Sequence, residues 1–272
     1  MQKTNLRVAI GGFGAIGKTV ARALHEGIEG LGLVAVSARD TERAERWMQA
    51  EFGQAYPVHP LGQLADHADV VVECCPAHLL GEVARPTLEA GKTLIVLSVG
   101  ALLSHPDLEP LAAGSGGRIL VPSGALLGLD AVQAAAQGQI ESVSIETRKP
   151  PKSLMGAPGI EKMGLDLSTL TEPILCYSGP AAQAISGFPA NLNVAVALGL
   201  AGIGTDRTMV EIWADPGVTR NTHRISVTSD SANFTMQIEG IPSEENPRTG
   251  RLTPLSAIST LKRLGAPLVI GA

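Results

Sequence analysis

The chain has 272 residues, 44% of them hydrophobic, which suits one large or two modest domains with a substantial core. Aromatic residues make up only 3%, and a net charge of −5 without any basic run argues against a nucleic-acid-binding surface. No apolar stretch is long enough to span a bilayer and the first residues carry no hydrophobic signal region, so we expect a cytoplasmic protein.

The first predicted elements are a strand, a glycine-rich turn and a helix. Leu6–Ile10 is a short apolar run, and helical periodicity begins at Lys18. Between them lies the sequence Gly12-Phe13-Gly14-Ala15-Ile16-Gly17. This G-x-G-x-x-G spacing binds a dinucleotide when it joins a strand to a helix, because the glycines permit a sharp turn, close approach of the pyrophosphate and tight helix packing. The turn therefore predicts a cofactor site at the helix N-terminus, and a tight turn without a ligand is the alternative.

The second strand, Leu33–Ser37, ends where such folds contact the adenosine ribose. An acidic residue there favours NAD, but this chain has Ser37, and Arg39 follows it. Ser37 and Arg39 suit a ribose 2′-phosphate, which leaves both NAD and NADP open. Asp40 has two interpretations, either a ribose contact or the N-cap of a helix over Thr41–Phe52.

Strands and helices then alternate up to Val121, which predicts a Rossmann-type parallel sheet covered on both faces. The expected elements are the strands Asp69–Glu73, Lys92–Leu97 and Arg118–Val121 and the helices Pro76–Ala90 and Asp107–Ala113. Cys74 and Cys75 are expected to be buried thiols in an apolar strand rather than a disulfide or a metal pair. The third cysteine, Cys176, and the histidines have no zinc-site spacing, so no metal is expected.

Beyond residue 122 the pattern changes to a second, α+β domain with a mainly antiparallel sheet. Its expected strands are Ile140–Arg148, Thr171–Ser178, Thr208–Asp215, Thr222–Ser229 and Asn233–Gly240, the last three forming an antiparallel sheet in sequence. Its expected helices are one ending near Ala136, Pro180–Phe188 and Asn191–Gly199, and Gly156–Ser168 is a loop or short helix. A last helix, Pro254–Leu264, is expected to return to the first domain, giving residues 1–121 with 246–272 as the dinucleotide-binding domain and 122–245 as the catalytic and dimerisation domain.

His223 is the strongest candidate for an acid–base group. It stands at the start of a predicted strand in the second domain, whereas the other five histidines lie in the first half as surface or packing residues. Asn191 and Asn193 open an otherwise apolar helix, one as a possible N-cap and the other as a polar group that needs a partner if buried. The candidates for holding substrate carboxylates are Arg148, Lys149, Arg220, Arg224 and the backbone N–H groups of Ser123 and Gly124.

Several segments along the chain together resemble the L-aspartate dehydrogenase family. They are Gly12–Gly17, Ser98-Val99-Gly100-Ala101, Pro122-Ser123-Gly124-Ala125, Thr147-Arg148-Lys149-Pro150-Pro151, Pro189-Ala190-Asn191-Leu192-Asn193, Asn221-Thr222-His223 and Asn246-Pro247-Arg248-Thr249-Gly250. The resemblance implies a homodimeric enzyme of NAD biosynthesis that oxidises L-aspartate with NAD or NADP to iminosuccinate, which hydrolyses to oxaloacetate and ammonia. It further implies that His223 is the catalytic histidine and that Ala125 and Asn193 bind the nicotinamide cofactor.

Two other classes remain as alternatives. One is a related enzyme, either an imine reductase similar to dihydrodipicolinate reductase or a semialdehyde dehydrogenase. A semialdehyde dehydrogenase needs a nucleophilic cysteine near the start of the second domain, and none of the three cysteines is placed there. The other class is a non-catalytic protein that senses the dinucleotide.

Overall fold

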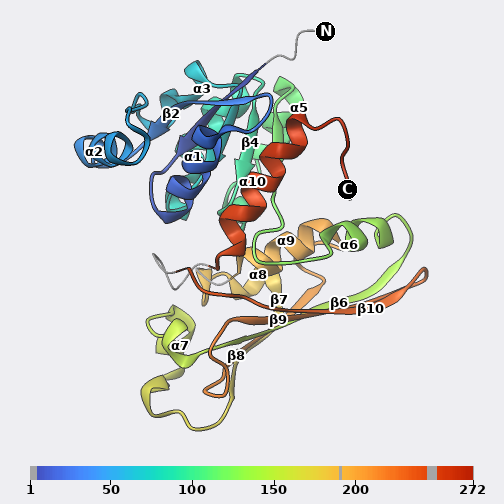
Figure 1. The fold of residues 1–272 in the computed structure, drawn as a ribbon. Helices are drawn as coiled ribbons and strands as arrows, with labels where there is room; N and C mark the ends of the chain where they lie inside the picture. Colours follow the sequence, from blue (N-terminus) through green and yellow to red (C-terminus); the bar gives the residue numbers. More distant parts are fainter. Residues whose placement is uncertain (1–4, 190–191, 244–249, 272) are drawn as a thin grey trace. The chain divides into compact units, whose positions relative to one another are not determined.

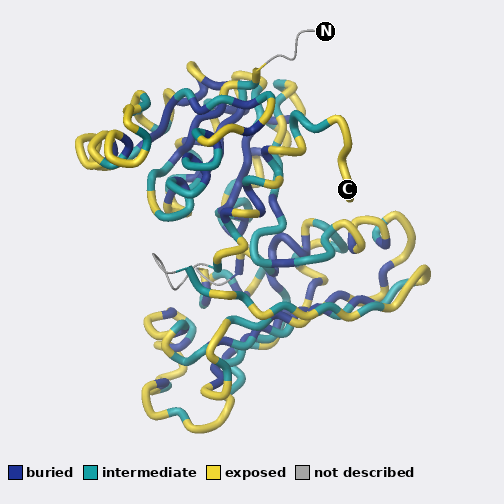
Figure 2. Tube along the Cα trace, in the orientation of Figure 1, coloured by how far each residue is buried: buried dark blue, intermediate teal, exposed yellow. Residues whose placement is uncertain are grey.

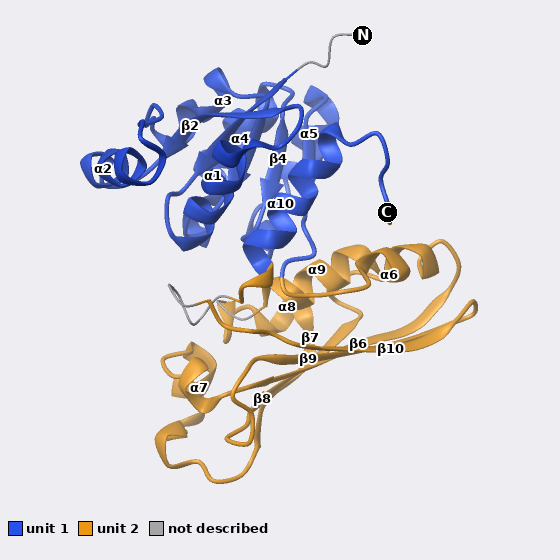
Figure 3. Ribbon diagram, viewed as in Figure 1, with its two compact units in different colours: residues 1–124, 253–270 blue, residues 125–252, 271–272 orange. Residues whose placement is uncertain are grey.

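The computed structural model describes residues 5–189, 192–243 and 250–271, and the chain divides into two units (Figures 1 and 3). Unit 1 comprises residues 1–124 and 253–270, and unit 2 comprises residues 125–252 and 271–272. The last helix of the chain, α10 (Leu252–Gly265), therefore belongs almost entirely to the unit formed by the N-terminal half.

Unit 1 is built on a five-stranded sheet in which every neighbouring pair is parallel. The strand order is β2-β1-β3-β4-β5. The strands are β1 (Leu6–Gly11), β2 (Leu31–Ser37), β3 (Val70–Glu73), β4 (Thr93–Val96) and β5 (Arg118–Leu120). The predicted Rossmann-type sheet is thus confirmed, and the carboxyl ends of β1, β2, β3 and β4 meet at one edge.

The helices of unit 1 follow the strands in alternation. They are α1 (Ala15–Gly27), α2 (Thr41–Phe52), α3 (Leu64–His67), α4 (Leu80–Glu89), α5 (Leu108–Ser115) and α10, with 3₁₀ turns at Leu61–Gln63, Ala77–Leu79 and Val99–Ser104. The helix expected over Pro76–Ala90 is split, because Pro76 starts a 3₁₀ turn and the α-helix begins only at Leu80. Cys74 and Cys75 lie beyond the end of β3 rather than within a strand.

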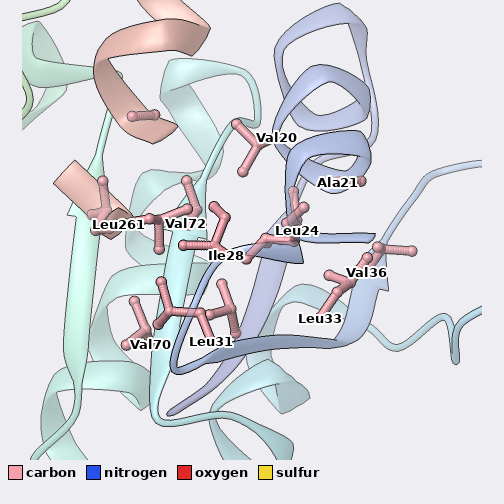
Figure 4. Close-up of a cluster of buried hydrophobic side chains, with 14 of the residues drawn as sticks. Val20, Ala21, Leu24, Ile28, Leu31, Leu33, Val36, Val70, Val72 and Leu261 are labelled. Carbon is pink, nitrogen blue, oxygen red and sulfur yellow. The ribbon is translucent and has the colours of Figure 1, made fainter. Parts of the chain in front are cut away.

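Both faces of this sheet are buried, which explains its continuous apolar strands. Alternate residues such as Val8, Ile10 and Val72 join one hydrophobic cluster, to which α1 contributes Leu24 and α10 contributes Leu261 (Figure 4). The residues between them on the strands join a second cluster beneath α3, α4 and α5. The inner strands β1, β3 and β4 are accordingly mostly buried, whereas the edge strand β5 is not (Figure 2).

Unit 2 contains a five-stranded mixed sheet in the order β10-β9-β6-β8-β7. Its strands are β6 (Ile140–Lys149), β7 (Ile174–Pro180), β8 (Thr208–Ala214), β9 (Thr222–Ser229) and β10 (Asn233–Glu239). Three of the neighbouring pairs are antiparallel, but β6 lies between β8 and β9 and runs parallel to β8. The expected consecutive pairing of β8 with β9 is therefore wrong. Residues 215–221 make a long connection, whereas the short one at 230–232 does form a hairpin.

The helices of unit 2 are short. They are α6 (Leu129–Ala135), α7 (Pro158–Met163), α8 (Ala181–Ala184) and α9 (Asn193–Ala201), with 3₁₀ turns at Pro151–Ser153 and Leu167–Thr169. The predicted helix over Pro180–Phe188 is reduced to α8, since Pro180 still belongs to β7. In the described part of the chain, no helix combines the length and the apolar character that a membrane span requires.

Candidate active site

The glycine turn after β1 has the conformation that its sequence predicts. Gly12 has a φ of +109°, and a Cβ added there would lie 2.6 Å from the carbonyl oxygen of Cys74, so both the backbone and its neighbour exclude a side chain. The N–H of Gly12 donates to the carbonyl oxygen of Ser37 at 3.1 Å. The structure thereby brings the glycine turn together with the end of β2.

The other two glycines of the motif differ in what surrounds them. A Cβ on Gly17 would lie 2.1 Å from the carbonyl oxygen of Gly12, so Gly17 is required for the helix to pack against the turn. Gly14 is exposed, and among the described residues a Cβ there would meet no atom within 4 Å. Gly14 is also the N-cap of α1, and it provides no side-chain hydrogen bond to the first turn. The N-terminus of α1 therefore fits a pyrophosphate, because its first N–H groups border space that the described residues leave open and are not capped by the side chain at the N-cap.

The remaining residues of the turn hold it by packing. The ring of Phe13 meets that of Trp47 edge to face, with 5.3 Å between centroids. Ile16 packs against the hydrophobic cluster on the α1 face of the sheet. Ala15 is half-buried in the first turn of α1, and its carbonyl oxygen accepts the hydroxyl of Thr19 at 2.9 Å. The side chains between the glycines thus stabilise the turn, and the backbone is left to face a ligand.

The polar residues after β2 divide between two roles. The carboxylate of Asp40 accepts the backbone N–H of Arg43 at 2.9 Å, so Asp40 caps α2. Ser37 is buried at the end of β2, while Arg39 is exposed. The helix-cap interpretation of Asp40 is confirmed, and Ser37 and Arg39 stay the predicted ribose or phosphate contacts.

Sequence reasoning missed the part played by Glu73. This carboxylate is fully buried at the end of β3, and its Oε2 accepts the backbone N–H groups of Leu97 at 3.1 Å and Ser98 at 2.8 Å. Its Oε1 accepts the N–H of Cys75 at 3.0 Å and the hydroxyl of Ser98 at 3.0 Å. Burial raises the pKa of Glu73, and the hydrogen bonds from Ser98 and Leu97 oppose that rise. Glu73 joins the carboxyl ends of β3 and β4. The sequence feature that could have indicated this role is an acidic residue at the end of an apolar strand.

The neighbouring thiols are not suited to nucleophilic chemistry. Cys75 is buried and Cys74 is half-buried, and both are free. Burial, reinforced by the Glu73 carboxylate, raises the pKa of Cys75 to about 12 and that of Cys74 well above its usual range. Because the thiolate is the nucleophile, neither cysteine is activated near neutral pH.

His223 lies on the buried face of the unit 2 sheet, 4% exposed. It pairs directly with Thr147 of β6, and the Thr147 hydroxyl lies 3.0 Å from His223 Nδ1. Burial lowers the pKa of His223 to about 3, with a smaller contribution from the positive charge of Lys149. The imidazole is therefore neutral at pH 7, and an Nδ1–H that donates to Thr147 leaves Nε2 as the atom able to accept a proton.

The residues predicted to bind a substrate carboxylate do not all lie on the same face of the unit 2 sheet. Thr147 and Lys149 share the buried face of β6 with His223, because alternate residues of a strand face the same side. Arg148 is on the opposite side, where its guanidinium bonds Glu146 at 2.8 Å and Asp215 at 3.0 Å. The backbone N–H of Gly124, which was predicted to hold a substrate carboxylate, donates to the Ser256 hydroxyl at 3.1 Å. Arg148 and Gly124 are thus engaged within the protein.

The other predicted site residues lie in unit 2 or outside the described residues. Ala125 is half-buried at the start of unit 2, and Asn193 is exposed at the first position of α9, whose N-cap is Leu192. Asn191 and the segment Asn246-Pro247-Arg248-Thr249 fall outside the described residues. Arg220 and Arg224 are exposed.

Comparisons with known proteins match both units. The family described as "Aspartate dehydrogenase, C-terminal" matches residues 130–264, and "Homoserine dehydrogenase, NAD binding domain" matches residues 12–122. L-aspartate dehydrogenase 3 of Bordetella bronchiseptica is 54% identical over 99% of this chain and 98% of its own length. L-aspartate dehydrogenase of Bradyrhizobium diazoefficiens is 52% identical over 98% of this chain and 95% of its own length.

Solved structures extend the likeness to the whole architecture. The crystal structure of aspartate dehydrogenase from Thermotoga maritima has a TM-score of 0.77 at 25% identity and covers 98% of this chain and 99% of its own. A scyllo-inositol dehydrogenase from Lactobacillus casei, with a TM-score of 0.55 at 12% identity, covers 97% of this chain and 88% of its own and shares the fold alone.

A glycine turn opening a parallel sheet and a second α+β unit with a mixed sheet are the architecture of a dehydrogenase that uses a nicotinamide dinucleotide. Among such dehydrogenases, this one is an amino-acid dehydrogenase. The chain belongs to the L-aspartate dehydrogenase family, as its relatives at 54% and 52% identity over nearly its full length establish.

Proposed function

We propose that the protein oxidises L-aspartate at the Cα–N bond with NAD or NADP and also catalyses the reverse reductive amination. The Cα hydrogen leaves as hydride, the amine loses a proton, and the resulting iminosuccinate takes up water to give oxaloacetate and ammonia. The names of the relatives at 54% and 52% identity support this substrate. A role in NAD biosynthesis is part of the same proposal.

His223 carries the acid–base step in this proposal. A neutral imidazole, oriented by Thr147 through Nδ1 at 3.0 Å, presents Nε2 as a proton acceptor. It takes the proton from the substrate amine or from the water that attacks the imine. General acid–base catalysis of this kind contributes roughly a hundred- to ten-thousandfold in rate. The buried His223–Thr147 pair is the single observation on which this mechanism depends.

The cofactor is held in unit 1 at the glycine turn. The N–H groups at the start of α1 bind the pyrophosphate, Gly14 leaves room for it, and Ser37 and Arg39 lie at the adenosine end. Ala125 and Asn193 contact the nicotinamide end, as the family resemblance implies. When bound, the nicotinamide ring supplies the hydride acceptor. Glu73 stabilises the strand ends beside the turn, so that the protein's own backbone is fixed before the cofactor enters.

The test is an absorbance assay of the reduced nicotinamide, run with L-aspartate and separately with NAD and NADP, and in reverse with oxaloacetate and ammonia. We expect turnover with L-aspartate, and we expect His223→Asn to retain cofactor affinity and lose turnover at least a hundredfold. His78→Asn, at an exposed histidine of unit 1, is the matched control and should behave as wild type. Cofactor binding without turnover of either substrate pair would instead indicate a dinucleotide sensor, and turnover only on cyclic imines would indicate a reductase.

We also propose a homodimer, from the same resemblance. Sedimentation velocity on the full chain tests this, and a single species at the monomer mass of 28.1 kDa at micromolar concentration would contradict it.

A further inference from the structure

Lys149 is a buried cation beside the proposed acid–base residue. It ends β6, two positions after Thr147 and on the same face, and it is 6% exposed. Thr147 pairs with His223 across the β6–β9 ladder. Lys149, two positions further along β6, is therefore a diagonal neighbour of His223. The charge of Lys149 is close enough to His223 to contribute to the lowering of the pKa of the imidazole.

Arg148, the other cation of this segment, belongs to a different environment. Its guanidinium is held by Glu146 at 2.8 Å and Asp215 at 3.0 Å, and it lies 4.8 Å from the ring centre of Trp213. These partners come from the face of the sheet opposite to His223. The adjacent residues therefore lie in separate environments: Arg148 forms ion pairs within the protein, whereas Lys149 shares the buried face of β6 with Thr147.

Burying an ammonium group works against folding. Burial lowers the pKa of Lys149 from its usual 10.5 to about 8, which means that the folded protein disfavours the charged form. Hydrophobic residues of similar volume usually stabilise such positions at least as well as a buried charge. A buried lysine on the same face of the sheet as the acid–base residue is therefore a candidate for binding a negatively charged group of the substrate.

We propose that Lys149 binds a carboxylate of the substrate and thereby selects a dicarboxylic amino acid. This inference rests on the proposed function, because it takes His223 as the residue next to the reacting amine. A carboxylate at Lys149 has a second effect, since it offsets the positive charge that contributes to lowering the pKa of His223. Substrate binding thereby makes the imidazole a stronger base in the complex than in the free enzyme.

The experiment compares Lys149→Met with Lys152→Met. Both changes remove one positive charge, but Lys152 is exposed in the neighbouring 3₁₀ turn. Three quantities are measured on the full chain: the KM for L-aspartate, the KM for the cofactor, and the thermal midpoint with and without succinate, a dicarboxylate that cannot react. Lys149→Gln repeats the series should the methionine variant fail to fold.

We expect Lys149→Met to raise the KM for L-aspartate ten- to a hundredfold, the usual range for losing a hydrogen bond to a charged group, with the cofactor KM unchanged. We also expect it to abolish the stabilisation by succinate, which Lys152→Met should retain. An aspartate KM within twofold of wild type would overturn the inference, as would a lowered midpoint with both KM values raised together. Because succinate binding needs no turnover, it tests Lys149 even if the wild type proves inactive on L-aspartate, a result that would refute the proposed function alone.

Discussion

His223 should make the stability of unit 2 depend on pH in a way that a substitution removes. In the unfolded chain its imidazole has the usual pKa of about 6.5, whereas burial and Lys149 lower the pKa to about 3 in the folded protein. The stability contributed by the neutral imidazole is therefore complete above pH 6.5 and is lost as the pH falls from 6.5 towards 3.

The size of the effect follows from the two pKa values. Each pH unit in this range costs about 1.4 kcal/mol, because the unfolded chain binds a proton that the folded protein does not. Between pH 7 and pH 5 the expected loss is roughly 2 kcal/mol. Asparagine at position 223 does not titrate, so His223→Asn should lack this part of the pH dependence whatever its own stability.

Urea unfolding at pH 7 and pH 5 measures the loss, followed by the fluorescence of Trp213 in unit 2. The chain has two tryptophans, so a Trp47→Phe background makes Trp213 the only one. His78→Asn serves as the control, because this histidine is exposed and the variant should retain the full pH dependence. The reasoning is refuted if wild type and His223→Asn lose the same free energy of unfolding, within about 0.5 kcal/mol, between the two pH values.

Three further predictions concern unit 1. Glu73→Gln places an amide N–H₂ against at least one backbone N–H and should cost about 1–3 kcal/mol in urea unfolding, whereas an unchanged midpoint would mean that the carboxyl group is already protonated. Gly14→Ala should raise the cofactor KM while leaving the thermal midpoint in place, since its Cβ would meet no atom of the described residues within 4 Å. Gly17→Ala should lower the midpoint as well, because its Cβ would lie 2.1 Å from the carbonyl oxygen of Gly12. Equal midpoints for these two variants would contradict that distinction. Leu261→Ala should destabilise the protein by about 2–5 kcal/mol, since the side chain is fully buried in the sheet core, and a loss below 1 kcal/mol would show that α10 is not part of that core.

Local patterns in the sequence were sufficient wherever neighbours along the chain decide the conformation. The glycines at 12, 14 and 17 predict their turn because backbone sterics act over a few residues, and Asp40 caps α2 through a residue three positions away. Alternating strands and helices likewise predict a parallel sheet, because a parallel connection requires a crossover. The same local patterns predicted the strands of unit 2 but not their order. The central position of β6 depends on its pairing with β8 and β9, which lie far along the chain.

The tertiary structure alone decided the chemistry of individual side chains. Thr147 and His223 are 76 positions apart, and only the register of β6 against β9 places a hydroxyl on the imidazole. Arg148 and Lys149 are equivalent cations in the sequence, yet the pleat of one strand places the first beside the carboxylates of Glu146 and Asp215 and buries the second on the opposite face. The sequence by itself determined which residue types were available and which turns they form. Burial and charge, which set protonation and binding, depend on neighbours that are remote in the chain, and therefore only the fold could assign them.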